Sequence, residues 1–232
     1  MKYILILIAG LTIFTAQAQD EAQQAQDSIP YEFNRQAYIY QLAKGYNDPV
    51  IARMALYNLL SYNTANTNLL DTLALMYFDY NQMASAALTA QDAATINEND
   101  LFATEIAAVA FERLGVYPKA IPFYEKLYTS SLDINTLYKL AFLQMQSKNF
   151  VEASTNADGI IESTKSDEFK LLFPKNDKEN QEVSLKAAAY RLKGLIEESQ
   201  GNISLAKDFY QKALDMEPEF QLVKDELAAL NK

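Results

Sequence analysis

The sequence predicts an all-α protein, an α-solenoid of stacked helical hairpins, and three observations indicate this fold class. Amphipathic stretches of helix length alternate with short polar or glycine-containing breaks over most of the chain. Five of these stretches carry an alanine early in the helix, and a break precedes each alanine. These alanines are Ala52, Ala86, Ala120, Ala153 and Ala206, so the intervals between them are 34, 34, 33 and 53 residues. A regular period of this length is typical of repeat proteins, in which neighbouring hairpins bury each other's apolar faces.

The first 18 residues differ from the rest and indicate export. Lys2 precedes a short apolar run, Tyr3 to Phe14, and small residues follow at Ala16 and Ala18. The run is shorter than the about 20 residues that a membrane-spanning helix needs. A positive end, a short apolar run and an A-x-A pattern predict a cleaved signal peptide over residues 1–18, with an uncleaved anchor as the alternative. The protein is therefore expected to be periplasmic or secreted.

Residues 19–32 are polar and form an expected spacer between the signal and the repeats. Cleavage would make Gln19 the first residue of the mature chain. Within the spacer, Asp27-Ser28-Ile29 resembles a short acceptor pattern for periplasmic O-glycosylation, a tripeptide that is also common by chance. The Asn202-Ile203-Ser204 sequon fits a structural turn better than a glycosylation site.

The clearest copy of the repeat extends from Ala187 to Phe220. It combines small residues at close helix contacts with aromatic residues and a closing proline, at Tyr190, Gly194, Gly201, Ala206, Tyr210, Ala213 and Pro218. This pattern resembles the tetratricopeptide repeat (TPR) family. The resemblance implies a right-handed solenoid of about five TPR hairpins within residues 33–232, with copies near 33–66, 67–100, 101–133, 134–165 and 187–220. The copy at 101–133 matches well, two are looser, and the first depends mainly on Ala52 and the register.

Packing explains why the pattern has these residue types. Small residues such as Ala108 and Gly194 let two helices approach closely, and large residues such as Phe111 and Tyr210 fill the gaps between hairpins. Pro122 fits poorly in a helix interior, so we expect its helix to start near Lys119 or to have a distorted first turn.

Two segments depart from the plain repeat. After Pro218, residues 219–231 form an expected amphipathic helix that covers the end of the solenoid. The long 53-residue interval holds an insertion at 166–186, in which two apolar arms flank a polar stretch. The sequence favours a short β-hairpin and a disordered loop about equally there, and such an insertion is a candidate contact surface.

Composition excludes several classes of function. The net charge is −10 without any basic run, which argues against nucleic-acid binding. Cys and His are absent, so there is no disulfide, thiol, histidine-based nucleophile system or usual zinc site. With six glycines there is no phosphate-binding loop. The acidic pairs Glu197-Glu198 and Glu98 with Asp100 are expected to be solvated charges. We therefore expect a protein that is not an enzyme and has no cofactor or metal, and no later segment is long and apolar enough to span a membrane.

The TPR resemblance implies a concave groove lined by the first helix of each hairpin. It places the following residues there: Asp71, Leu75 and Phe78; Glu105, Val109 and Glu112; Tyr138, Phe142 and Met145; Arg191, Leu195 and Glu198. Each trio has i, i+4, i+7 spacing and so shares one helix face. Some TPR proteins hold a C-terminal carboxylate with a lysine and asparagine clamp. Here Asp71, Glu105 and Tyr138 stand where a cation would be, so that clamp is not expected.

We therefore expect an exported interaction module whose groove holds a peptide, a partner helix or part of an envelope complex. An apolar stripe edged by carboxylates would suit an amphipathic helix, or an apolar segment with basic flanks. Packing between first helices is the alternative reading of the same apolar residues. A structural, self-associating protein is the second functional hypothesis, with contacts through a solenoid end or a tyrosine-rich first hairpin. The tyrosines of that hairpin are Tyr31, Tyr38, Tyr40, Tyr46, Tyr57 and Tyr62.

Overall fold

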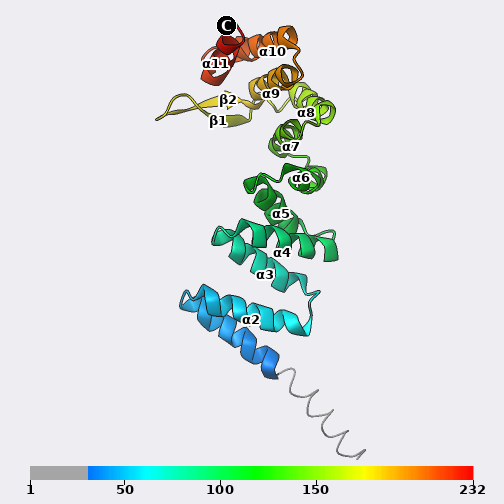
Figure 1. Ribbon diagram of the computed structural model, residues 1–232, viewed down its shortest axis with the longest axis vertical. Coiled ribbons are helices and arrows are strands. Elements are labelled where there is room, and N and C mark those ends of the chain that lie inside the picture. Colours follow the sequence, from blue (N-terminus) through cyan, green and yellow to red (C-terminus); the bar gives the residue numbers. More distant parts are fainter. Residues whose placement is uncertain (1–30, 232) are drawn as a thin grey trace, which may run out of the picture.

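The computed structural model describes residues 31–231, which form an elongated stack of helical hairpins (Figure 1). The predicted signal peptide, Gln19 and Ser28 lie outside these residues. A helix over residues 31–45 comes first. It is followed by α2 (Pro49–Tyr62), α3 (Thr67–Asp79), α4 (Met83–Ile96), α5 (Leu101–Arg113), α6 (Tyr117–Ser131), α7 (Ile134–Gln146), α8 (Phe150–Glu162), α9 (Leu185–Ser199), α10 (Ile203–Met216) and α11 (Gln221–Ala229). The predicted all-α solenoid is confirmed, and no helix within residues 31–231 is long and apolar enough to cross a membrane.

The turn inside each hairpin has the same backbone geometry at five places. One residue with positive φ follows the first helix, at Asn47, Asn81, Gly115, Lys148 and Gly201. The next residue donates its N–H to the carbonyl five positions back, for example from Gln82 to Tyr77 at 2.8 Å and from Asn202 to Glu197 at 2.9 Å. This is the Schellman ending of a helix. The breaks predicted from sequence are therefore chain reversals defined by backbone hydrogen bonds.

The first helices of the later hairpins, α3, α5, α7 and α9, begin with a side-chain cap. Asp100 accepts the N–H of Ala103 at 2.9 Å, and Asp133 accepts the N–H of Thr136 at 2.8 Å. Asn66 and Ser184 cap α3 and α9 in the same way. By contrast, α4, α6, α8 and α10, which follow Schellman turns, have no side-chain cap. Among the second helices, α2 is the exception, because Asp48 caps it.

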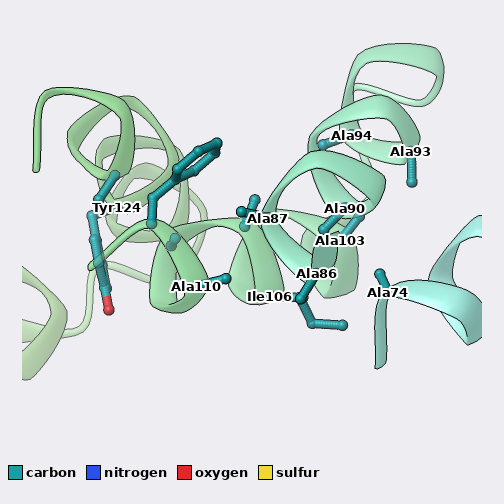
Figure 2. Packing of buried hydrophobic residues seen from close by; sticks show 14 of the residues in the cluster. Ala74, Ala86, Ala87, Ala90, Ala93, Ala94, Ala103, Ile106, Ala110 and Tyr124 are labelled. Atoms are coloured by element: carbon teal, nitrogen blue, oxygen red, sulfur yellow. The ribbon is translucent and has the colours of Figure 1, made fainter. Parts of the chain in front are cut away.

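Small buried residues allow the helices around α4 and α5 to pack closely. Figure 2 shows alanines of both helices among the buried residues of one cluster, which also includes Ala74 of α3, Ile106 of α5 and Tyr124 of α6. The alanines of this interface are fully or almost fully buried: Ala74, Ala86, Ala87, Ala90, Ala93, Ala94, Ala103 and Ala110. The predicted division between small contact residues and large gap-filling residues is confirmed. Apolar burial of this kind, repeated along the stack, supplies the core.

The structure corrects the expected start of one helix. α6 begins at Tyr117 rather than near Lys119, and Pro122 lies inside it. Pro122 has no N–H to donate to the carbonyl of Pro118, four residues earlier. Pro118 and Pro122 are both exposed, so water can hydrogen-bond to that carbonyl, and the helix continues through the proline.

The insertion contains a β-hairpin, which resolves the two alternatives left open by the sequence. Strand β1 (Lys170–Pro174) pairs antiparallel with β2 (Asn180–Ser184), and Leu172 lies opposite Glu182. Phe173 anchors the hairpin: its ring centroid lies 5.0 Å from that of Phe220. In Figure 1 the hairpin extends sideways from the stack beside α9.

Helix α11 covers the last hairpin, as expected of a terminal cap. Val223 is fully buried, and Phe220 just before the helix is 1% exposed. Arg191 of α9 holds α11 through Glu226, with Nη2 to Oε1 at 2.6 Å and Nε to both carboxylate oxygens at 3.1 Å. A planar guanidinium bonded twice to a carboxylate fixes the angle of the cap as well as its position.

Candidate functional site

A cavity of about 550 Å³ lies where the first described helix meets α3. The helix over 31–45 provides one wall, the turn before α2 provides the floor, and α3 provides the opposite wall. Phe102 at the start of α5 closes one side. The Tyr80 hydroxyl donates to the side-chain oxygen of Asn47 at 3.3 Å, which links this turn to the end of α3 one repeat later. Two residues predicted for the groove, Asp71 and Leu75, line this cavity.

Asp71 is the most unusual charged residue of the cavity. Its Oδ1 is buried and has no hydrogen-bond partner within residues 31–231. The pKa of Asp71 is raised from 3.8 to about 6, mainly because the carboxyl group is buried and secondly because the carboxylate of Asp100 lies beside it. Two carboxylates that share a site cannot both ionise without repulsion, so this pair tends to hold a proton or to attract a cation.

The other predicted residues of α3 and α5 differ in how open they are. Leu75 is 39% exposed, and Glu105 is also exposed. Val109 is partly buried against the core. Phe78 is covered by Arg113 of α5, whose guanidinium carbon lies 4.6 Å from the ring centroid. The open part of this face therefore centres on Leu75 and Glu105.

Glu112 takes part in bonds within the solenoid. It accepts a short hydrogen bond from the Tyr124 hydroxyl of α6, and it pairs with Lys139 Nζ of α7 at 2.8 Å. Burial and the contact with Glu112 together raise the pKa of Tyr124. Glu112 therefore joins three successive helices and is less available to a ligand than Glu105.

The residues predicted on α7 are largely covered. Met145 is 8% exposed and belongs to the core, so packing is the correct reading for it. Phe142 is partly buried against the same cluster. Tyr138 lies beside Arg191, and its burial raises its pKa to about 12. This stretch is more packing surface than open groove.

The residues predicted on α9 also bond to neighbours within the chain. Arg191 is paired with Glu226 of the cap, as described above, and Leu195 packs between two core clusters. Glu198 accepts the hydroxyl of Tyr210 at 2.6 Å. The Lys193–Asp158 pair at 2.5 Å adds a further link from α9 to α8.

The structure thus brings together part of the predicted set. Asp71 and Leu75 meet in the N-terminal cavity, whereas the α7 and α9 residues are held by the fold itself. Sequence reasoning missed three aromatic residues of the cavity as site residues: Tyr40, Tyr80 and Phe102. Phe102 had a detectable signal, since it lies three residues before Glu105 on the same face of the helix.

A second, more polar hollow of about 490 Å³ lies among α6, α7 and α8. Asn156 donates to Gln144 at 2.7 Å inside it, so its polar groups are partly paired. Among the described residues, no group of His, Cys, Asp and Glu side chains is arranged to hold a metal ion.

Comparison with solved structures finds proteins of the same fold. A tetratricopeptide repeat protein from Parabacteroides merdae ATCC 43184 is 19% identical, covers 86% of this chain and 72% of its own, and has a TM-score of 0.54. The MamA protein is 17% identical, with 81% and 93% covered and a TM-score of 0.54. YrrB, described as a TPR protein with an unusual peptide-binding site, is 14% identical, with 82% and 89% covered and a TM-score of 0.59.

No protein-family model and no curated protein sequence matches the chain. At these identities the structural likeness establishes the fold alone. The repeated Schellman turns, the alanine interfaces and the solved structures agree with one another. The chain therefore has the tetratricopeptide-repeat fold and resembles the proteins of that family.

Proposed function

We propose that this protein is a non-enzymatic interaction scaffold that binds a peptide or a partner helix on the face of its first helices. The observation that supports this best is the N-terminal cavity, where apolar and acidic side chains meet on that face. A concave site with an apolar lining and a few polar groups is the usual form of a binding site. The peptide-binding site reported for YrrB supports the same class of function by analogy of fold.

We assign no catalytic role to the charged residues of this face. Glu112, Arg191 and Glu198 bond to other side chains of the chain, which gives them a structural use. The sequence also lacks the Cys and His on which nucleophile systems usually depend.

We further propose that the scaffold works outside the cytoplasm, in the periplasm or as a secreted protein. The proposal depends on residues 1–18, whose composition is that of a cleaved signal peptide. Intact-mass measurement of the protein purified from its own cells tests it. A chain beginning at Gln19 is expected, and a chain that retains residues 1–18 would contradict cleavage.

A crosslinked pull-down from the native cell envelope tests the binding role. The full-length chain with a C-terminal tag is the bait, and Leu75→Glu is the variant, because Leu75 lines the cavity and is 39% exposed. Leu88→Glu is the matched control, since Leu88 is 56% exposed on α4 and outside the cavity. Partners captured by the wild type and the control but lost with Leu75→Glu are expected. Identical captures from all three baits would contradict a binding role for this face.

Self-association is a second candidate function, favoured by the exposed aromatic residues of the N-terminal end. Tyr31, Tyr38 and Tyr46 are 70%, 65% and 84% exposed, and Val50 and Met54 of α2 are also exposed. The opposite end is covered by α11. Sedimentation equilibrium tests this role: a mass that rises with protein concentration and falls to the monomer in Tyr38→Glu would support it. A constant monomer mass would exclude it.

A further inference from the structure

We propose that the N-terminal cavity receives a basic side chain, arginine or lysine, of the bound partner, with its charged group next to Asp71. This inference rests on the proposed binding function and specifies the chemistry that one part of the site would recognise. The cavity is the place on the first-helix face where acidic and aromatic residues lie together around an open volume.

The charges around the cavity favour a cation. Its lining includes Asp48, Asp71 and Asp79 against a single lysine, Lys44. Asp48 already accepts the N–H groups of Val50 and Ile51, at 3.2 and 3.1 Å, as the cap of α2. Asp71 and Asp79 remain as carboxylates of α3 for which no ion pair forms within residues 31–231. The local charge is therefore negative on the wall formed by α3.

The buried oxygen of Asp71 gives a second reason. A buried polar atom without a hydrogen-bond partner is rare in native proteins, because the lost solvation is not repaid. Asp71 Oδ1 is such an atom within the described residues, and its neighbour Asp100 is another carboxylate, which can satisfy it only when one of the two carboxyl groups holds a proton. A cation that enters the cavity would lower the repulsion between the two carboxylates and favour their ionised forms.

The apolar lining fits a long side chain with a charged end. Ala43, Ala52, Leu75 and Met76 offer contacts to an aliphatic stem, as lysine and arginine stems usually find. Tyr40, Tyr80 and Phe102 provide aromatic rings, which attract cations over their faces. A carboxylate ligand would instead meet acidic residues, and a purely apolar ligand would leave them without a partner.

The raised pKa of Asp71, about 6, gives a pH dependence that supports this geometry. Below that pH the carboxyl holds a proton and competes with the cation. Binding of a basic side chain should therefore strengthen as pH rises from about 5 to about 7.5, and it should be accompanied by proton release.

A pair of tripeptides tests the proposal by NMR titration of the isotope-labelled protein purified from cells. One is N-acetyl-leucyl-arginyl-leucine amide, and the other has citrulline, a neutral isostere, in place of arginine. The variant is Asp71→Asn, and Asp92→Asn on α4 is the control with the same change of charge. Phe102→Ala is a second variant, because Phe102 is 46% exposed and its truncation leaves the core intact.

The expected result is binding of the arginine peptide with amide shifts around Tyr40, Leu75 and Phe102. Its affinity should exceed that of the citrulline peptide by about tenfold, and Asp71→Asn should remove about that factor, because a charge-assisted hydrogen bond is lost. Phe102→Ala should weaken binding, and Asp92→Asn should leave it unchanged.

Equal affinity for the two peptides, or shifts confined to α7 and α9, would overturn the proposal. Failure here is distinguishable from failure of the binding function. If Leu75→Glu still abolishes partner capture while both peptides bind equally, the scaffold role stands and the basic side chain is wrong. If the arginine peptide binds as expected and no cellular partner is captured, the cavity chemistry stands without the scaffold role.

Discussion

Gly194 and Tyr210 show at the scale of single residues how the helices of one hairpin approach each other. A Cβ atom at position 194 would overlap the ring of Tyr210, which is fully buried. Gly194→Ala should therefore lower the free energy of unfolding by about 1–3 kcal/mol through overpacking. Urea denaturation measures this. Gly159→Ala is the matched control: its Cβ would make only an ordinary contact with Leu137, so the better helix former should raise stability slightly.

Lys148 has a left-handed backbone, with φ of 64°, at the turn where Gly115 and Gly201 serve in other repeats. That conformation costs an L-residue energy that glycine avoids, partly offset by the greater freedom of glycine in the unfolded chain. Lys148→Gly should raise the free energy of unfolding by about 0.5–1 kcal/mol. Lys148→Ala keeps the steric cost and should bring no such gain. Chemical denaturation of the two variants side by side would contradict this explanation if both gained equally.

Asp71 should make stability depend on pH. Its pKa is raised from 3.8 to about 6 in the folded chain, so the protonated form is favoured by folding. This contribution is present below pH 3.8 and is lost as pH rises through about 6. Asp71→Asn has no such titration, so its melting temperature relative to wild type should increase between pH 4 and pH 7. A difference that stays constant over that range, measured by circular dichroism, would show that Asp71 is not desolvated.

Residue types were predictable from sequence where sterics alone select them. Alanine and glycine at the close contacts, and aromatic residues in the gaps, follow from the repeat pattern. The partner of a charged side chain was not predictable in the same way. Glu112 and Arg191 look like open groove residues in the sequence, because their partners Tyr124, Lys139 and Glu226 come from other helices.

At the scale of elements, Phe173 of β1 anchors the β-hairpin together with Val183 of β2, which is 1% exposed. The ring centroid of Phe173 lies 5.0 Å from that of Phe220. The guanidinium carbon of Arg191 lies 5.6 Å from the ring centroid of Phe173. Phe173→Ala should release the hairpin from α9 and α11, so that amide hydrogen exchange accelerates over residues 170–184. Exchange over α3 to α5 should be unchanged, because the main contacts of the hairpin are with α9 and α11.

Leu172→Ala is the control for this experiment. Leu172 lies in the same strand but is 69% exposed, so its removal should leave exchange in the hairpin nearly unaltered. Equal acceleration in both variants would indicate that strand composition, rather than the anchor, holds the hairpin.

Helices and strands differed in how far sequence could define them. Helix positions followed from amphipathic periodicity and from the breaks between helices. The insertion could not be decided, because two short arms form a stable hairpin only when a larger body covers one face. That body is provided by Phe220 and α9, which the local sequence does not reveal. The predicted start of α6 was wrong, because an exposed proline is tolerated inside a helix where water can bond to the carbonyl four residues earlier, here that of Pro118.

For the whole molecule, stability should vary along the stack. Each hairpin contacts mainly its neighbours, so a terminal hairpin is supported from one side only. Native-state hydrogen exchange should show the slowest amides in α4, α5 and α7 and faster ones in the helix over 31–45 and in α11. Uniform protection over all helices would mean that the chain unfolds as one cooperative unit.

The overall architecture was predictable because the same pattern of small residues at helix contacts and large residues in the gaps recurs about every 34 residues. The site was only partly predictable. The TPR resemblance selected Asp71 and Leu75, which line the N-terminal cavity, but it could not tell that the α7 and α9 residues of the same face make contacts within the chain. Openness depends on the lengths and partners of many side chains together.

The placement of the insertion has a consequence for how this chain can be lengthened. The extra 19 residues, 53 minus 34, separate α8 from α9, where no Schellman turn ties the helices together. α8 and α9 still pack directly, through Asp158 and Lys193 and through buried Ile160 and Ala189. The inserted residues therefore extend sideways from the stack, and α8 and α9 keep their packing against each other. The connection between hairpins is thus a permissive graft point. A binding loop or reporter domain inserted in place of the exposed residues 175–179 would leave Phe173 packed on Phe220 and Ser184 at the start of α9.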